Sequence, residues 1–159
     1  AAAHWNEVEA ALHGAQRYRL AHERYASLER LGMLHISAAR GLAEDDHGAT
    51  SNTSGAPLAG YAVFTLVSCP PCPQTLLAAL DGLYLAPGAR GGLFALRLLR
   101  HAESALAARG VSLVQYSSPA SRPCHALYRR LGAQPTETIW HKTLPPPPAK
   151  AAGTIEEDS

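Results

Sequence analysis

Features that would place this chain outside the ordinary globular class are scarce. The 159 residues contain no apolar run of about 18 residues and no basic N-terminal region followed by an apolar stretch. Both absences predict a cytoplasmic protein with no membrane partner. Cysteine is scarce too, because three residues, an odd number, do not suggest a disulfide framework. This again favours the cytosol.

An excess of charge of either sign is also missing. Lys and Arg number 14 against 13 acidic residues, which gives a net charge of +1 and no broad basic field, so nucleic acid is not an expected partner. The remaining composition, 47% hydrophobic and 17% charged, can bury the core of one domain. We expect that domain over residues 1–144, followed by a Pro-rich, then acidic, disordered tail over 145–159.

Hydrophobic periodicity predicts the elements of the first half. Helices are expected at 5–12 and 20–31, the second ended by Gly32, and strands at 33–39 and 58–67. The polar residues 41–57 between the two strands predict a long loop. Three prolines within 69–73 predict an irregular segment, because proline lacks a backbone donor.

In the second half, predicted strands and helices alternate, which indicates an α/β domain. The pattern favours a short helix at 74–80, a strand at 82–86, a long helix that ends at Gly110, and a strand at 111–116. A last helix is expected from the N-cap Ser121 to Gly132, and a final strand at 136–144.

The most informative stretch is the turn Pro87-Gly88-Ala89-Arg90-Gly91-Gly92 between a predicted strand and a predicted helix. Glycine lets backbone N–H groups approach an anion closely, and a helix N-terminus adds a partial positive charge that favours phosphate. Many glycine-rich turns between a strand and a helix are only turns. Whether this turn indicates a phosphate site therefore depends on the residues around it.

Those surroundings contain a series of short matches in a fixed order: Leu83-Tyr84-Leu85-Ala86-Pro87, Arg90-Gly91-Gly92-Leu93-Phe94-Ala95, Leu98-Leu99, Glu103, Leu127-Tyr128-Arg129-Arg130-Leu131-Gly132, Trp140 and Lys142-Thr143-Leu144. In order and spacing, residues 58–144 resemble the core of the GNAT N-acetyltransferase superfamily. They look most similar to small acetyltransferase-like proteins of phage and bacterial origin. The resemblance implies an α/β fold with a mixed, mainly antiparallel, central sheet flanked by helices.

The resemblance also implies acetyl-CoA as the acyl donor, bound in the opening between the strands at 82–86 and 111–116. The residues that match the cofactor-binding motif are Leu83, Tyr84, Leu85, Arg90, Gly91, Gly92, Leu93, Phe94 and Ala95. One of them departs from the family signature, because Leu93 stands where glycine is usual and would crowd the pyrophosphate. The implied reaction is direct attack by a primary amine, on a small molecule or a peptide, without a metal.

Two residues match catalytic positions of the family. Tyr128 stands where many members carry the acid that protonates the leaving thiolate, and a phenol with a usual pKa near 10 is protonated at neutral pH. It also lies on the apolar stripe of its helix, so a packing role stands beside the catalytic one. Asp81 lies where members often carry an acidic residue facing the acceptor, yet Asp-Gly is also a turn-forming pair.

Other functions stay open at this stage. Cys69 and Cys72 form a Cys-x-x-Cys pair after a strand, which is the context of a thiol redox site. The same pair with Cys124 and a histidine would give zinc four ligands, although no second closely spaced pair exists. A noncatalytic GNAT-like module is favoured by Leu93, because fold does not imply function. The sequence pattern specifies neither the acceptor nor the oligomeric state, for which a homodimer is one candidate.

Overall fold

The structure is a computed structural model that describes residues 2, 5–9, 18–41, 43–44, 50–51, 56–69, 71–120, 123–142 and 144. The predicted tail at 145–159 lies outside these residues. The elements, in chain order, are the π-helix η1 (Trp5–Glu9), α3 (His22–Arg30), β1 (Leu34–Arg40), β2 (Ala43–Glu44), β3 (Thr50–Ser51), β4 (Leu58–Ser68), β5 (Leu76–Leu85), the 3₁₀ turn η2 (Pro87–Ala89), α4 (Phe94–Ala108), β6 (Leu113–Gln115) and α5 (His125–Leu131).

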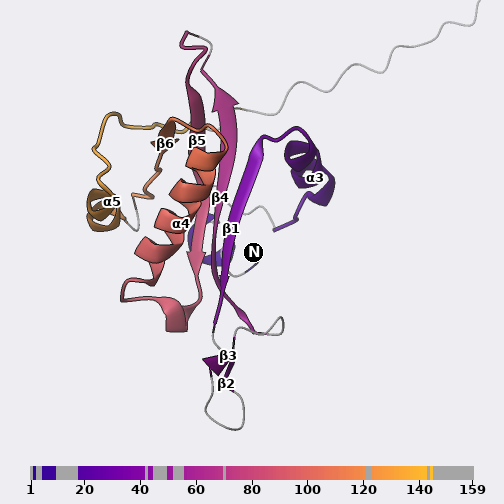
Figure 1. Ribbon diagram of the computed structural model, residues 1–159, viewed down its shortest axis with the longest axis vertical. Helices are drawn as coiled ribbons and strands as arrows, with labels where there is room; N and C mark the ends of the chain where they lie inside the picture. The colour runs from indigo at the N-terminus through magenta and orange to yellow at the C-terminus, as the bar shows by residue number, and fades with distance from the viewer. Residues whose placement is uncertain are drawn as a thin grey trace, which may run out of the picture.

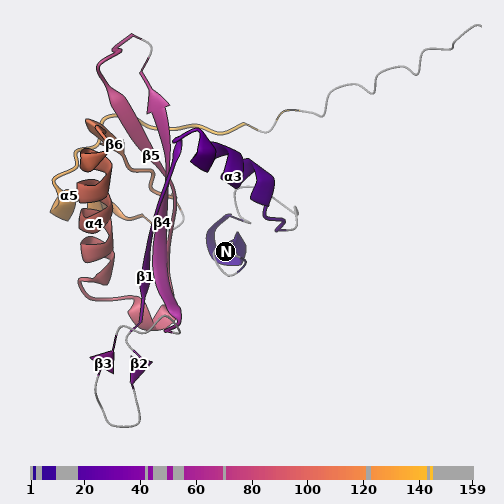
Figure 2. The ribbon, with the colours of Figure 1, turned by 45° about the vertical axis from the view of Figure 1, so that its right-hand side comes forward.

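One four-stranded sheet organises the molecule, with the order β1-β4-β5-β6. The β1–β4 and β4–β5 pairs are antiparallel, and β5 and β6 are parallel. Helices α4 and α5 lie on one side of the sheet and α3 on the other (Figures 1 and 2). The expected α/β architecture, a mixed and mainly antiparallel sheet flanked by helices, is confirmed.

The hydrophobic core lies between the sheet and α4. Alternation along β4 buries Ala62, Phe64 and Leu66, and the apolar stripe of α4 places Leu99 and Leu106 against them. Burying each leucine or phenylalanine side chain contributes roughly 1.5–3 kcal/mol. At the far end of α4, Gly110 adopts a φ of +83°, which suits glycine at a helix terminus.

Gly60 allows the start of α4 to pack closely on the sheet. A Cβ at this position would lie 2.6 Å from Leu85 Cδ2, 2.9 Å from the Tyr84 carbonyl oxygen and 3.3 Å from a ring carbon of Phe94. Because a backbone oxygen cannot move aside as a flexible side chain can, only glycine fits without displacing the end of β5. This contact helps to fix the loop between β5 and α4.

The structure contradicts the predicted secondary structure of two segments. Residues 74–80, predicted as a helix, are largely strand, because Leu76–Leu80 pair with residues 64–68 of β4, and such pairing overrides weak local helix preference. The strand predicted at 82–86 is thus the second half of a longer β5. Within 136–142 and at 144 no strand forms, and Trp140 is 89% exposed. An alternating pattern forms a strand only where a neighbouring strand pairs with it.

Other boundaries shift. Strand β6 is shorter than the predicted 111–116, and α5 begins at His125 with Cys124 at its N-cap position, whereas the predicted N-cap Ser121 lies outside the described residues. Of the loop predicted at 41–57, residues 43–44 and 50–51 pair as the β2–β3 ladder. The helix predicted at 5–12 is described only over Trp5–Glu9, where it is a π-helix.

Candidate active site

Strands β5 and β6 separate partway along β5. Their parallel pairing covers Leu77–Ala79 and Leu113–Gln115, and the later residues of β5 pair only with β4 among the described strands. The Ser117 hydroxyl donates a 3.0 Å hydrogen bond to the Leu80 carbonyl at the point of separation. The two segments named as walls of the cofactor opening therefore diverge from a hydrogen-bonded junction.

Asp81 lies directly after this junction and inside β5. Phe64 pairs with Leu80 and Val63 with Gly82, so Asp81 is the extra residue of a β-bulge. Its carboxylate is exposed and accepts a hydrogen bond from the Thr65 hydroxyl. The alternative of a turn-forming Asp-Gly pair is wrong. Bulges re-aim side chains and are frequent beside active sites.

Tyr128 reaches the same junction from α5. Its hydroxyl donates a 2.6 Å hydrogen bond to the Ser117 carbonyl, and the side chain is only 8% exposed. Burial, and then the neighbouring Cys124 thiol, raise the pKa of the Tyr128 phenol above its usual value near 10. Tyr128 is therefore a packed core residue, and it is also a protonated hydroxyl at the strand separation.

Tyr116 supports Tyr128 and was not identified from the sequence. Its ring stacks on that of Tyr128, with centroids 4.8 Å apart, and its hydroxyl donates a 2.7 Å hydrogen bond to Glu103 of α4. Burial, and then the hydrogen bond and charge of Glu103, raise the pKa of the Tyr116 phenol. The only signal in the sequence was Glu103 among the matched residues, and no spacing indicated Ser117.

The loop after β5 presents backbone amides at the start of α4. Among the described residues, no backbone carbonyl accepts a hydrogen bond from the amides of residues 91–96. A Cβ added at Gly91 or Gly92 would meet no atom within 4 Å, and Gly91 has a φ of +92°. The loop thus combines open space with donors at the N-terminus of a 15-residue helix.

Leu93 and Arg90 have roles in this loop that the sequence pattern did not reveal. Leu93 is the N-cap residue of α4 with a φ of −93°, a conformation that needs no glycine, and its side chain is 52% exposed. The Arg90 guanidinium donates to the Leu85 carbonyl and pairs with Glu7 at 2.7 Å, and it lies 5.7 Å from the centre of the Tyr84 ring. Arg90 therefore fixes the loop to the end of β5.

The other predicted cofactor residues lie beside these. Leu83, Tyr84 and Leu85 are the last residues of β5, and Phe94 and Ala95 form the first turn of α4. The fold thus places the whole predicted binding set along the connection from the end of β5 to the first turn of α4.

The profile of the Acetyltransferase (GNAT) family matches residues 6–133. This chain belongs to that family. Solved structures similar to this GNAT domain include an acetyltransferase from Trypanosoma brucei, with a TM-score of 0.61, 13% identity, and coverage of 90% of this chain and 92% of that chain. A ribosomal-protein-alanine N-acetyltransferase from Brucella melitensis biovar Abortus 2308 has a TM-score of 0.58 and 17% identity over 90% and 93% of the two chains.

A glucosamine-6-phosphate N-acetyltransferase from Arabidopsis thaliana is also similar, with a TM-score of 0.57 and 10% identity over 78% of this chain and 76% of that chain. At such identities the likeness shows the fold and leaves the acceptor of this GNAT protein undetermined. No curated protein sequence matches the chain.

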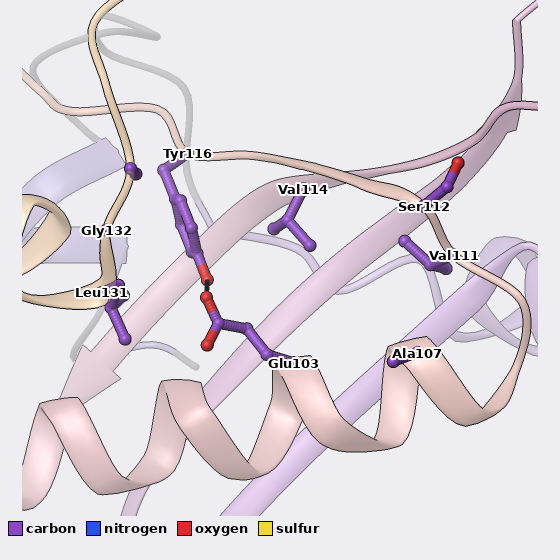
Figure 3. Close-up of a pocket in the computed structure, with 9 residues that line it drawn as sticks. Glu103, Ala107, Val111, Ser112, Val114, Tyr116, Leu131 and Gly132 are labelled. Atoms are coloured by element: carbon purple, nitrogen blue, oxygen red, sulfur yellow. Dashed lines mark hydrogen bonds between the residues drawn. The ribbon is translucent and has the colours of Figure 1, made fainter.

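A shallow open hollow of about 320 Å³ lies away from the loop of residues 90–95. Its lining comes from α4, from β6 and its flanks, and from the end of α5. The hydrogen bond between Tyr116 and Glu103 connects two of the lining side chains (Figure 3). Its lining includes none of the residues predicted as catalytic or cofactor-binding. Its two most polar side chains already bind each other.

The described part of the chain holds no group of three or more His, Cys, Asp and Glu side chains arranged to bind a metal. The zinc site considered for Cys69, Cys72 and Cys124 therefore has no support from the geometry. Nor does any helix within the described ranges have the length and apolar character to cross a membrane.

Proposed function

We propose that this GNAT protein transfers an acetyl group from acetyl-CoA to a primary amine on a small molecule or a peptide. The observation that carries the proposal is the loop of residues 90–95, where amides without a described backbone partner meet the positive end of α4. Backbone donors at a helix N-terminus form a recurrent site for phosphate groups. The pyrophosphate of CoA is such a group.

The residues present fit this ligand. A Cβ added at Gly91 or Gly92 would meet no neighbouring atom, and Arg90 fixes the loop through its contacts with Leu85 and Glu7. Leu83–Leu85 pair with β4 on one edge, and no described strand pairs with their other edge. Backbone groups on that second edge, apart from any that Arg90 already binds at Leu85, are available to the amide-containing arm of CoA. Acetyl-CoA would supply the activated thioester, and this chain would bind and orient it.

Two side chains would move the protons. Asp81, exposed at the bulge, would accept a proton from the amine as the C–N bond forms, and Tyr128 would give its hydroxyl proton to the departing thiolate. The raised pKa of Tyr128 keeps that proton in place at neutral pH. To deliver it, the hydroxyl must turn away from the Ser117 carbonyl, which costs about 1 kcal/mol for one hydrogen bond.

A noncatalytic CoA-binding module is the second candidate. Two observations favour it: the exposed Leu93 lies beside the loop amides, and the Tyr128 hydroxyl is already bonded to Ser117. Crowding at Leu93 would weaken pyrophosphate binding, and the occupied hydroxyl would slow proton transfer.

Calorimetric titration with acetyl-CoA, followed by an acceptor screen, separates the two candidates. We expect micromolar binding, about −8 kcal/mol, because only a few backbone donors and one helix terminus meet the pyrophosphate. An alanine-initiated peptide and glucosamine 6-phosphate are the first acceptors to try, since proteins of the same fold carry those names. Binding without release of CoA for any amine would favour the module. No heat at millimolar acetyl-CoA would contradict both candidates.

A further inference from the structure

The Cys-x-x-Cys pair lies far from the proposed acetyl-transfer site. Cys69 follows β4 and Cys72 precedes β5, in the hairpin that projects beyond the helices at one end of the molecule (Figures 1 and 2). The loop of residues 90–95 follows the other end of β5. A ten-residue strand spans about 30 Å, so the cysteines do not take part in acetyl transfer.

Backbone hydrogen bonds hold the two cysteines close together. The Cys72 amide donates to the Cys69 carbonyl at 2.9 Å, which is the bond that closes a four-residue β-turn. The Thr75 amide donates to the Cys72 carbonyl at 2.8 Å, and the Cys69 amide to the Thr75 carbonyl at 3.2 Å. A β-turn keeps its terminal Cα atoms within about 7 Å, and disulfides join Cα atoms about 4.4–6.8 Å apart.

The two thiols differ in access. Cys72 is exposed and Cys69 is half-buried, and neither is part of a disulfide in the structure. The third cysteine, Cys124, lies at the start of α5, where its amide donates to the Ser118 hydroxyl. The pair in the hairpin therefore has a surface thiol for first attack and a second thiol held within the same turn.

From this turn we infer a modification site: Cys69 and Cys72 form a reversible intramolecular disulfide by exchange with a small-molecule disulfide such as oxidised glutathione. The Cys72 thiolate attacks one sulfur, the glutathione S–S bond breaks, and one glutathione thiolate leaves and takes up a proton. The Cys69 thiolate then attacks Cys72 in the mixed disulfide, and a second glutathione leaves. The protein loses two electrons and two protons, which the two glutathione thiols gain.

The bond would close the outer end of the β4–β5 hairpin without touching the acetyl-transfer residues. Strand β5 pairs with both β4 and β6 close to this end, so the disulfide would hold the part of the sheet where all three strands meet. The inference is independent of the proposed function.

The test exposes the reduced full-length chain to oxidised glutathione and counts the glutathione released. Trypsin leaves both hairpin cysteines in one peptide, residues 41–90, and Cys124 in another, which provides an internal control. The wild type should release about two glutathione molecules per chain, and its 41–90 peptide should resist alkylation until it is reduced. Cys69→Ser should release about one and retain the other on Cys72.

Cys72→Ser supplies the matched comparison. It should react at least about tenfold more slowly than Cys69→Ser, because its remaining thiol is half-buried. A wild type that retains glutathione on Cys72 while Cys69 is still alkylated would overturn the inference. So would one zinc ion per chain that protects both thiols. Circular dichroism of both serine variants checks that each is folded.

Discussion

Tyr116, just after β6, and Tyr128, in α5, stack with their ring planes 20° apart. Their hydroxyls have separate partners, the carboxylate of Glu103 and the carbonyl of Ser117. The stack holds α5 against the segment after β6 and places the Tyr128 oxygen at the point where β5 and β6 separate. It also means that ring and hydroxyl can be tested separately.

Removing the Tyr128 hydroxyl should separate chemistry from packing. Tyr128→Phe keeps the stack and leaves one carbonyl unpaired, so the free energy of unfolding should fall by only about 1 kcal/mol. The turnover number should fall roughly 100- to 10,000-fold, with the dissociation constant of acetyl-CoA nearly unchanged. Steady-state kinetics and calorimetry measure the two. Tyr116→Phe is the control, since it keeps the ring and loses only the hydrogen bond to Glu103. Unchanged turnover in Tyr128→Phe would show that Tyr128 only packs in the core.

Asp81→Asn tests the proposed base with almost no change of shape. We expect turnover with the amine to fall roughly 100-fold or more, because an amide cannot accept the proton. Acetyl-CoA affinity and the melting temperature should hold, since the side chain is exposed. Thr65→Val, which removes only the hydroxyl that orients the carboxylate, should cost much less. Equal losses in the two variants would point to bulge geometry rather than to proton transfer.

Gly91 and Gly92 form a matched pair for the loop conformation. An added Cβ is unobstructed at both positions, but only Gly91 has a positive φ. Gly91→Ala should therefore lower the free energy of unfolding by about 1 kcal/mol, whereas Gly92→Ala should leave it nearly unchanged. Chemical denaturation of the two variants makes the comparison. If both variants lose the same stability, the positive φ is not what requires glycine at position 91.

The buried tyrosines predict a loss of stability at alkaline pH. Folding raises the pKa values of Tyr116 and Tyr128 above the ordinary value of 10.0, so the folded chain retains protons that the unfolded chain releases. The free energy of unfolding should therefore be unaffected by these groups below about pH 10 and fall as the pH rises further. Denaturation between pH 8 and 11 should show a flatter profile for the double variant Tyr116→Phe/Tyr128→Phe. Identical pH profiles for the wild type and the double variant would contradict the raised pKa values of the two tyrosines.

Local sequence patterns alone predict part of this fold. The alternation along 58–67 predicts β4, and the apolar stripe that stops at Gly110 predicts α4. The family motif located the loop of residues 90–95, because a glycine-rich turn before a helix depends on neighbouring residues only. Each of these features is set by chemistry within a few positions of the chain.

Only the tertiary structure decided the rest. Residues 74–80 become strand because β4 offers them partners, and 136–142 stay outside the sheet because no described strand pairs with them. The bulge at Asp81 exists only in the register of β5 against β4. The stack of Tyr116 on Tyr128 forms only because α5 packs against the segment that follows β6. Contacts between different segments of the chain determine these arrangements, and no local sequence pattern specifies them.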